Sequence, residues 1–262
     1  MTAAPRVRYA VVDGVAEITL DHTPVNALTE SMVDELLQAL RRAAADASAR
    51  AVILASALPR RFCAGLDLGA LHGAAPDAMR ALLDKLYTQL TDAQFALGKP
   101  SIAAVDGAAR GGGMTLAIGC DLLVAGRSAS FGYPEIDVGL LPAIHFTHLP
   151  RIVGRHRAFD LLFSARTFGA EEARQLGLVS RLVDEGQALA EARALAQVLA
   201  GKSPTAMQQG RAAFLRAIDS DYRRGVAGAV DTFCTVANSA DGREGVAAHA
   251  EKRAPHWRGT VG

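Results

Sequence analysis

The sequence predicts an α/β fold in which short strands alternate with helices. Two β-rich runs, Val7–Val12 and Val15–Leu20, flank Asp13-Gly14, which is the strongest short hairpin signal. Further along, the strand-like runs Ala51–Ser56 and Ser101–Val105 each lead into a glycine-bearing turn and then a helical pattern. Repeated strand–turn–helix units are typical of α/β proteins, and no Rossmann glycine fingerprint accompanies them here.

The helices are predicted from apolar periodicity and from capping residues. Thr29 is expected to cap a helix whose apolar face runs from Met32 to Leu40. A long helix is expected over Asp77–Leu97, ended by Gly98-Lys99-Pro100. Three further helices are expected, one after the glycines at 111–113 and the others at Arg155–Phe163 and Ala170–Leu176. Two further strands are expected at Leu122–Ala125 and Leu178–Val183. Gly177 is expected to be the C-cap of the helix that precedes the second of these strands.

From about Glu185 onward the pattern is helical only, with a new start at Ser203-Pro204. We therefore expect an α/β core over residues 1–200 and a helical C-terminal segment over residues 201–262. A chain of 262 residues with 50% hydrophobic content can bury a full core as one domain.

Composition excludes several classes of partner. The net charge is +1, from 28 basic and 27 acidic residues, and the few lysines are scattered, so no footprint for nucleic acid is expected. No run approaches the ~18 apolar residues of a membrane span, and no signal peptide is expected before the first strand. Cys63, Cys120 and Cys234 lie in apolar surroundings and are expected to be reduced thiols. We expect a soluble, cytoplasmic protein.

The segment Ala109–Asp121 carries the strongest functional signal, because three glycines lead into an apolar helical stretch. Glycine lets a backbone approach a ligand closely, and the N–H groups at a helix start favour an oxygen that carries or develops negative charge. Upstream, Cys63-Ala64-Gly65 forms a second small-residue turn, and downstream Glu135 follows Pro134. Two backbone donors and a carboxylate are the minimum for forming and reprotonating an enolate.

These motifs resemble the crotonase family, also called the enoyl-CoA hydratase/isomerase family, from about Val7 to the C-terminus. The matching segments are 23–29 (TPVNALT), 62–68 (FCAGLDL), 99–113 (KPSIAAVDGAARGGG), 120–126 (CDLLVAG), 131–142 (FGYPEIDVGLLP) and 244–257 (EGVAAHAEKRAPHW). The resemblance implies an α/β crotonase-like spiral of ββα units with a helical C-terminal trimerisation segment. It also implies an acyl-CoA substrate, no separate cofactor because coenzyme A is part of the substrate, and a homotrimer or homohexamer.

The resemblance implies that the backbone N–H groups of Leu66 and Gly112 form an oxyanion hole and that Glu135 is the acid/base. A carboxylate in an apolar, proline-bearing turn is partly desolvated, which raises its pKa. Asp137 is the reserve candidate. The residues expected to contact the substrate are Ala27, Ala64, Asp67, Leu68, Gly111, Thr115, Pro134, Arg61 and Lys252, with Arg61 (or Arg60) and Lys252 facing phosphate groups.

Thr115 departs from the family pattern, because hydratases of this family carry a glutamate at this position. Threonine cannot act as an acid or base near neutral pH, although its hydroxyl can hold a water. The stretch after Pro142 also departs, since hydratases are usually glycine-rich there and this chain is bulky. Relatives with one glutamate include Δ3,Δ2-enoyl-CoA isomerases, so isomerisation is the preferred function. Enoyl-CoA hydration is the close alternative, and thioester hydrolysis or decarboxylation also stays open.

His145 and His148 lie in this bulky stretch and are candidates for extra acid/base groups. A metal site is not expected, because no third ligand has suitable spacing. We expect both histidines to be pocket-wall or trimer-contact residues. A serine peptidase is rejected because Met114 and Thr115 stand where it would need a serine.

Overall fold

The predicted N-terminal hairpin begins the main sheet of the computed structural model, which describes residues 6–70, 76–219, 240–241, 244, 247–248, 251 and 253–257. Strands β1 (Val7–Val12) and β2 (Val15–Leu20) pair antiparallel, with Val12 opposite Val15. Asp13 and Gly14 both have positive φ, 49° and 77°. This conformation gives the tight turn that an Asp-Gly pair favours, so the hairpin is confirmed.

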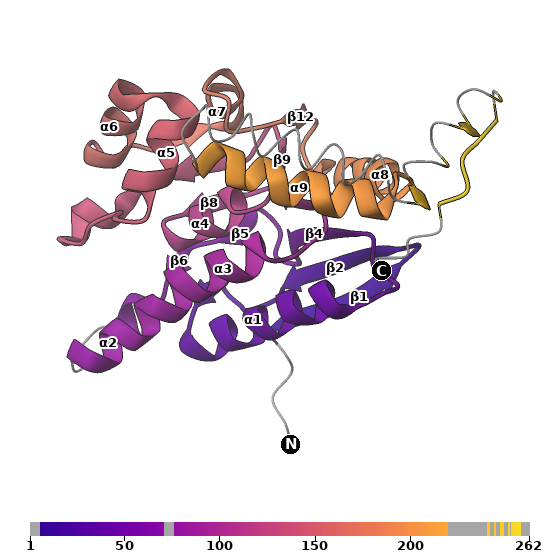
Figure 1. Cartoon of the computed structure of the whole chain (residues 1–262). Coiled ribbons are helices and arrows are strands. Elements are labelled where there is room, and N and C mark those ends of the chain that lie inside the picture. The colour runs from indigo at the N-terminus through magenta and orange to yellow at the C-terminus, as the bar shows by residue number, and fades with distance from the viewer. Residues whose placement is uncertain are drawn as a thin grey trace.

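The main sheet has the strand order β1–β2–β4–β7–β9–β12, and all its pairs except β1–β2 are parallel. Its other strands are β4 (Ala51–Ser56), β7 (Ser101–Val105), β9 (Leu122–Gly126) and β12 (Arg181–Val183). Helix α1 (Glu30–Ala45) covers one face, and α8 (Ala188–Ala200) covers the other (Figure 1). Successive side chains of β4 point to opposite faces of the sheet, and both faces are buried. Val52 and Leu54 pack on the α1 side, and Ile53 packs on the α8 side.

A second, smaller sheet continues the main strands and carries the site. Its order is β11–β10–β8–β5, from β11 (Phe168–Gly169), β10 (Ser130–Gly132), β8 (Ala108–Arg110) and β5 (Arg61–Cys63). Thus β4, β7 and β9 are each followed along the chain by a short strand of this sheet and then by helix, which is the predicted ββα repetition. Strands β3 (Ala27–Leu28) and β6 (Gly65–Leu66) form a separate parallel pair.

The predicted helix over Asp77–Leu97 is a continuous helical run, but it is not one regular helix. It consists of α2 (Pro76–Leu83), the π-helix η2 (Asp84–Gln89) and α3 (Leu90–Phe95). The wider π-helical turn changes which side chains face inward, and Leu86 and Leu90 are fully buried. The run ends at Phe95, two residues earlier than predicted.

Two further segments differ from the prediction. The strand expected over Leu178–Val183 is reduced to β12, because the N–H groups of Leu178 and Val179 bond to the Ala173 carbonyl at the end of helix α7 (Ala170–Gln175). Helix α5 (His145–Val153) was not predicted. The other helices are α4 (Gly112–Ile118), α6 (Arg155–Phe163) and α9 (Pro204–Asp219), with 3₁₀ turns η1 (Leu68–Ala70) and η3 (Pro134–Val138).

Helix α9 is attached to the core of its own chain by the buried Arg211. The Arg211 guanidinium lies 2.8 Å from a carboxylate oxygen of Asp121 and also donates to the carbonyls of Gln94 and Phe95. Each guanidinium edge therefore has a partner, as a buried cation requires. The expected boundary near residue 200 stays a prediction.

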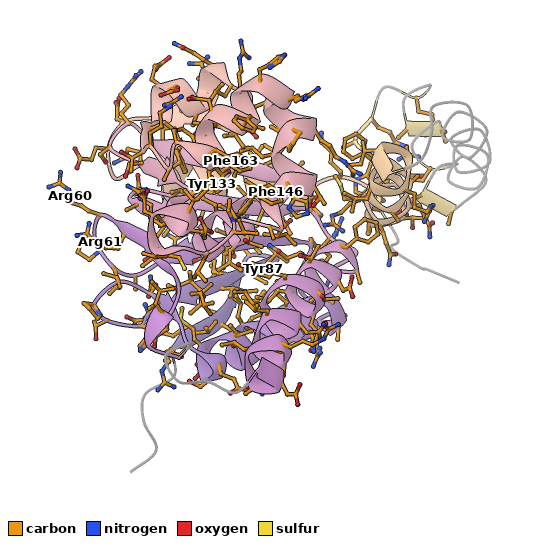
Figure 2. All side chains as sticks on the ribbon, turned by 90° about the vertical axis from the view of Figure 1, so that its left-hand side faces the viewer. Arg60, Arg61, Tyr87, Tyr133, Phe146 and Phe163 are labelled. Carbon is orange, nitrogen blue, oxygen red and sulfur yellow. The ribbon has the colours of Figure 1, made fainter. Side chains whose placement is uncertain are left out.

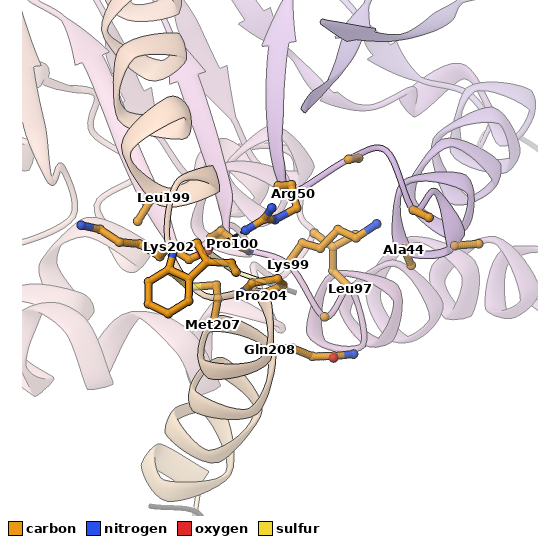
Figure 3. A pocket seen from close by; sticks show the side chains of 15 residues that line it. Ala44, Arg50, Leu97, Lys99, Pro100, Leu199, Lys202, Pro204, Met207 and Gln208 are labelled. Atoms are coloured by element: carbon orange, nitrogen blue, oxygen red, sulfur yellow. Dashed lines mark hydrogen bonds between the residues drawn. The ribbon is translucent and has the colours of Figure 1, made fainter. Parts of the chain in front are cut away.

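A cavity of about 410 Å³ lies beside the start of α9, at the end of the sheet where β4 and β7 begin (Figure 3). Two of the cations that line it donate hydrogen bonds to carbonyls near helix ends. Lys99 donates to the carbonyls of Ala43 and Asp46 where α1 ends, and Arg50 donates to the Lys202 carbonyl between α8 and α9. The Trp257 indole N–H donates to the Gly201 carbonyl at the same place. We therefore interpret this region as a structural junction.

Within the described part of the chain, no helix is both long and apolar enough to cross a membrane.

Candidate active site

The glycine turn between β8 and α4 adopts the conformation that its sequence predicts. Gly111 has φ 49° and ψ −116°, a combination that essentially only glycine tolerates. Its carbonyl accepts from the N–H groups of Met114 (2.8 Å) and Thr115 (3.2 Å). Because C=O and N–H point in opposite directions in a trans peptide, the Gly112 N–H points away from the body of the helix. One candidate oxyanion donor is therefore oriented by the start of α4.

Strand β6 brings the second donor, the N–H of Leu66, next to Gly112. Successive amides along a strand point to opposite sides. Since the Asp67 N–H bonds to the Leu28 carbonyl, the Leu66 N–H points away from β3. A Cβ added to Gly112 would lie 3.4 Å from the Leu66 nitrogen, and one added to Gly65 would lie 3.0 Å from the Gly112 nitrogen. The two amides are close neighbours because both glycines lack side chains.

Glu135 reaches the same place from η3, which follows β10. A Cβ added to Gly111 would come within 2.8 Å of the Glu135 Oε1 atom, so the carboxylate lies directly against the glycine turn. Its Oε2 atom is buried without a hydrogen-bond partner among the described residues. Burial raises the pKa of Glu135 above its ordinary value. A desolvated carboxylate with a free oxygen is suited to proton transfer.

A cavity of about 520 Å³ contains both amides and the carboxylate. Of the residues expected from the sequence, it brings together Ala64, Leu66, Leu68, Gly111, Gly112, Pro134 and Glu135. Its other walls are Gly65, Leu83, Tyr87, Val138, Gly139, Leu140, Leu141 and Ala143. A narrow polar strip faced by apolar side chains is typical of a site for a largely apolar ligand.

Tyr87 is a wall residue that the sequence analysis missed. Burial and the negative charge of Glu135 together raise the pKa of Tyr87 to about 12, so its phenol stays protonated. It projects from the π-helix η2, and π-helical turns are frequent at functional sites. No residue pattern in the sequence signals this turn, so Tyr87 was not distinguishable from an ordinary helical aromatic.

Several expected contact residues do not line this cavity. Ala27 pairs with Gly65 in the β3–β6 ladder, and the Asp67 carboxylate accepts from the Gly69 N–H at 3.0 Å in its own turn. Arg61 is exposed, and Figure 2 shows it projecting outward at the edge of the molecule, as Arg60 does. Asp137 is also exposed. Lys252 lies outside the described residues.

Thr115 and His145 form a buried pair behind the glycine turn. Thr115 is 1% exposed and His145 is 0% exposed, and Thr115 Oγ1 lies 3.3 Å from His145 Nε2. The same Nε2 lies 3.3 Å from the Gly111 carbonyl oxygen. A carbonyl only accepts, so Nε2 carries the hydrogen. Burial lowers the pKa of His145 to about 3, which leaves the imidazole neutral at physiological pH.

With this geometry, the site defines an enzyme that can hold an oxyanion between two backbone amides beside one carboxylate. The chain belongs to the enoyl-CoA hydratase/isomerase family, whose model matches residues 11–260. It is 36% identical over 251 residues to the probable mitochondrial enoyl-CoA hydratase 2 of Arabidopsis thaliana, covering 94% of this chain and 82% of that one. It is 38% identical over 256 residues to a probable enoyl-CoA hydratase of Rhodobacter capsulatus, covering 97% and 98%.

The fold is similar to that of solved enoyl-CoA hydratases. The enoyl-CoA hydratase from Bacillus anthracis gives a TM-score of 0.92 at 30% sequence identity, covering 97% of this chain and all of that one (100%). This confirms the predicted spiral of ββα units and the predicted family.

Proposed function

We propose that this protein binds an acyl-CoA and removes a proton next to the thioester carbonyl, so that an enolate forms. The N–H groups of Leu66 and Gly112 would hold the thioester oxygen, and Glu135 would take the proton. Fixed donors in a cavity that excludes water stabilise a developing oxyanion without reorganising, and losing one typically costs ~10²–10³ in rate. The observation that carries this proposal is the contact between the Glu135 carboxylate and the glycine turn, in one cavity with both amides.

The preferred reaction is Δ3,Δ2-enoyl-CoA isomerisation, because Glu135 is the one carboxylate among the described cavity residues. Glu135 would remove a proton from C2 of a 3-enoyl-CoA, and the electron pair would move into the thioester as an enolate. The same proton would return at C4 as the double bond moves to C2–C3. One carboxylate therefore acts first as base and then as acid. Coenzyme A would enter as part of the substrate.

Hydration of a 2-enoyl-CoA is the second candidate, and the names of the hydratase relatives favour it. This reaction needs a water that loses a proton as it attacks C3, while C2 gains one. Glu135 alone would have to position and activate that water, because Thr115 is buried against His145 and does not line the cavity. Thioester hydrolysis and decarboxylation remain further alternatives within the same oxyanion chemistry.

A panel of acyl-CoA thioesters tests the proposal. For one acyl chain, the rates of 3-enoyl-CoA isomerisation and 2-enoyl-CoA hydration are both followed through the absorbance of the conjugated thioester. We expect isomerisation to be the faster. Turnover of neither substrate, with hydrolysis or decarboxylation of other acyl-CoAs instead, would replace the preferred reaction with one of the alternatives. Binding without any turnover would contradict enzymatic function.

We also propose a homotrimer or homohexamer in the cytoplasm. Helix α9 supports assembly, because Phe214 and Ile218 on its surface are 65% and 57% exposed and large apolar side chains favour burial at an interface. Light scattering of the purified protein at micromolar concentration tests the assembly, and a monomer would contradict it.

A further inference from the structure

The imidazole of His145 makes its hydrogen bond to the peptide that carries one of the two proposed oxyanion donors. The Gly111 carbonyl and the Gly112 N–H belong to the same peptide unit. His145 Nε2 lies 3.3 Å from that carbonyl oxygen. A donor at the carbonyl end polarises the peptide, which makes its N–H a stronger donor at the other end. Contact with His145 therefore acts on the amide that would face the thioester.

His145 is the donor that connects this peptide to a separate element of the fold. The other donors to the Gly111 carbonyl, Met114 and Thr115, belong to α4 and move with it. His145 belongs to α5. Its ring also packs on the ring of Tyr133, with centroids 4.5 Å apart. Tyr133 lies two residues before Glu135, so one imidazole contacts the backbone of the proposed oxyanion donor and a side chain of the segment that carries the proposed acid/base.

Packing alone does not explain a histidine at this position. The side chain is completely buried, and its Nδ1 atom has no hydrogen-bond partner among the described residues. A buried polar atom without a partner destabilises the fold. Leucine or phenylalanine could fill this space without that cost. The histidine retains one useful property, which is a rigid N–H directed at the Gly111 carbonyl.

We propose that His145 is a positioning residue that holds the Gly111–Gly112 peptide so that the Gly112 N–H points at the thioester oxygen. This inference rests on the proposed function, because it requires that the oxyanion forms at Gly112. It does not depend on whether the enzyme isomerises or hydrates. His145 does not line the cavity, so it would act through the Gly111–Gly112 peptide and not by contact with a substrate bound there.

Two substitutions of similar size and flexibility separate the hydrogen bond from the packing. The His145→Gln variant keeps a side-chain N–H, whereas the His145→Met variant has none. We expect the Met variant to lose about 10- to 100-fold in kcat with KM changed less than about threefold, because misalignment of one oxyanion donor mainly affects the transition state. We expect the Gln variant to recover most of that loss. His156→Gln, an exposed histidine on α6, is the matched control.

A spectroscopic measurement reports on the donor itself. The probe is octanoyl-CoA labelled with ¹³C at the thioester carbonyl, a saturated thioester with no double bond to move or hydrate. Bound to the unaltered enzyme, its carbonyl stretch should fall in frequency because two N–H groups polarise it. The Met variant should move the frequency back toward that of the free thioester, and the Gln variant should not. Circular dichroism melting curves identify any variant that is not folded.

The outcomes distinguish this inference from the proposed function. If the unaltered enzyme binds the probe without a carbonyl shift, the oxyanion hole and this inference both fail. If it shows the shift and the folded Met variant keeps both the shift and kcat, only the role of His145 is overturned. Equal losses in the Gln and Met variants would also overturn it, because shape rather than hydrogen bonding would then matter. Should neither variant fold, ¹⁵N NMR of the unaltered protein decides, since protonation at Nδ1 instead of Nε2 would contradict the bond to Gly111.

Discussion

The carboxylate of Glu135 lies directly against the backbone of Gly111, so that a Cβ on Gly111 would come within 2.8 Å of Glu135 Oε1. The missing side chain at Gly111 therefore does two things. It permits the left-handed backbone at φ 49° that starts α4, and it leaves room for Glu135, the proposed acid/base, beside the two proposed oxyanion donors. The first prediction follows from this contact.

Replacing Gly111 by alanine should reduce kcat by about 10²-fold, because the methyl group displaces the carboxylate and strains the turn that orients the Gly112 N–H. Gly169→Ala is the matched control, since a Cβ at Gly169 meets nothing within 4 Å. Steady-state kinetics on the best enoyl-CoA of the panel measures both variants. Equal activity of the Gly111 variant and the control would mean that the carboxylate is not held against this turn during catalysis.

Replacing Glu135 by glutamine should abolish turnover while acyl-CoA binding survives, because only the proton-transfer group is removed. Calorimetric titration with octanoyl-CoA measures the binding. Retention of more than about a tenth of the activity would exclude Glu135 as the principal acid/base, since such groups contribute ~10²–10⁴-fold.

The same variant should be more stable than the unaltered protein at neutral pH. The raised pKa of Glu135 means that the folded protein holds this proton more tightly than the unfolded chain. The contribution of Glu135 to the free energy of unfolding is therefore lost as the pH rises from its pKa in the unfolded chain to its higher pKa in the folded protein. The thermal midpoint of Glu135→Gln should exceed that of the unaltered protein above this window and match it below. A glutamine variant that is less stable at pH 8 would contradict the burial of an ionised carboxylate here.

Much of the fold was predictable because local chemistry and global structure agree. The Asp13-Gly14 hairpin and the Thr29 cap, whose hydroxyl accepts from the Met32 N–H at 3.3 Å, are examples. Leu66, Gly112 and Glu135, the residues of the proposed site, were predictable through the family motifs, and the structure brings them into one cavity. Helix α5 was missed because it contains Pro150 and lies close after Pro142, which both read as breakers.

The partners of Tyr87 and His145 were not predictable from the sequence. Tyr87 depends on a π-helical turn that only tertiary packing selects. His145 was expected in a pocket wall or a subunit contact, and the structure instead buries it behind the glycine turn. Both assignments depend on contacts between segments far apart in the chain, such as Gly111 with His145.

Arg211 should be essential for the attachment of α9. Removing this guanidinium takes one hydrogen-bond donor away from the Asp121 carboxylate and from each of the Gln94 and Phe95 carbonyls. Breaking a buried ion pair typically costs about 3–5 kcal/mol, so Arg211→Met should lower Tm by about 5–15 °C. Arg193→Met is the control, because it removes a largely exposed partner of Glu17 and should change Tm by less than about 3 °C. Similar melting temperatures for the two variants would contradict the anchoring role.

The two departures from the hydratase pattern, at Thr115 and in the stretch after Pro142, touch each other in the structure, since Thr115 Oγ1 lies 3.3 Å from His145 Nε2. In the sequence, the threonine at position 115 and the bulky residues after Pro142 are two separate departures from the hydratase pattern. Their contact means that the imidazole fills space beside Thr115 that a longer side chain would need. A single substitution is therefore not sufficient to restore a second carboxylate.

We expect Thr115→Glu alone to give no gain in hydration and to lower Tm, because Thr115 is 1% exposed and a glutamate would meet the His145 ring. Combining it with His145→Gly frees that space, so the ratio of hydration to isomerisation should rise at least about tenfold relative to the unaltered enzyme. His145→Gly alone is the control, because it lowers both rates without adding a carboxylate. The ratio, measured on one acyl chain, removes any general loss of activity from the comparison. If the unaltered enzyme already hydrates at ~10–10³ s⁻¹ and isomerises more slowly, one glutamate suffices for hydration and the preference for isomerisation is wrong.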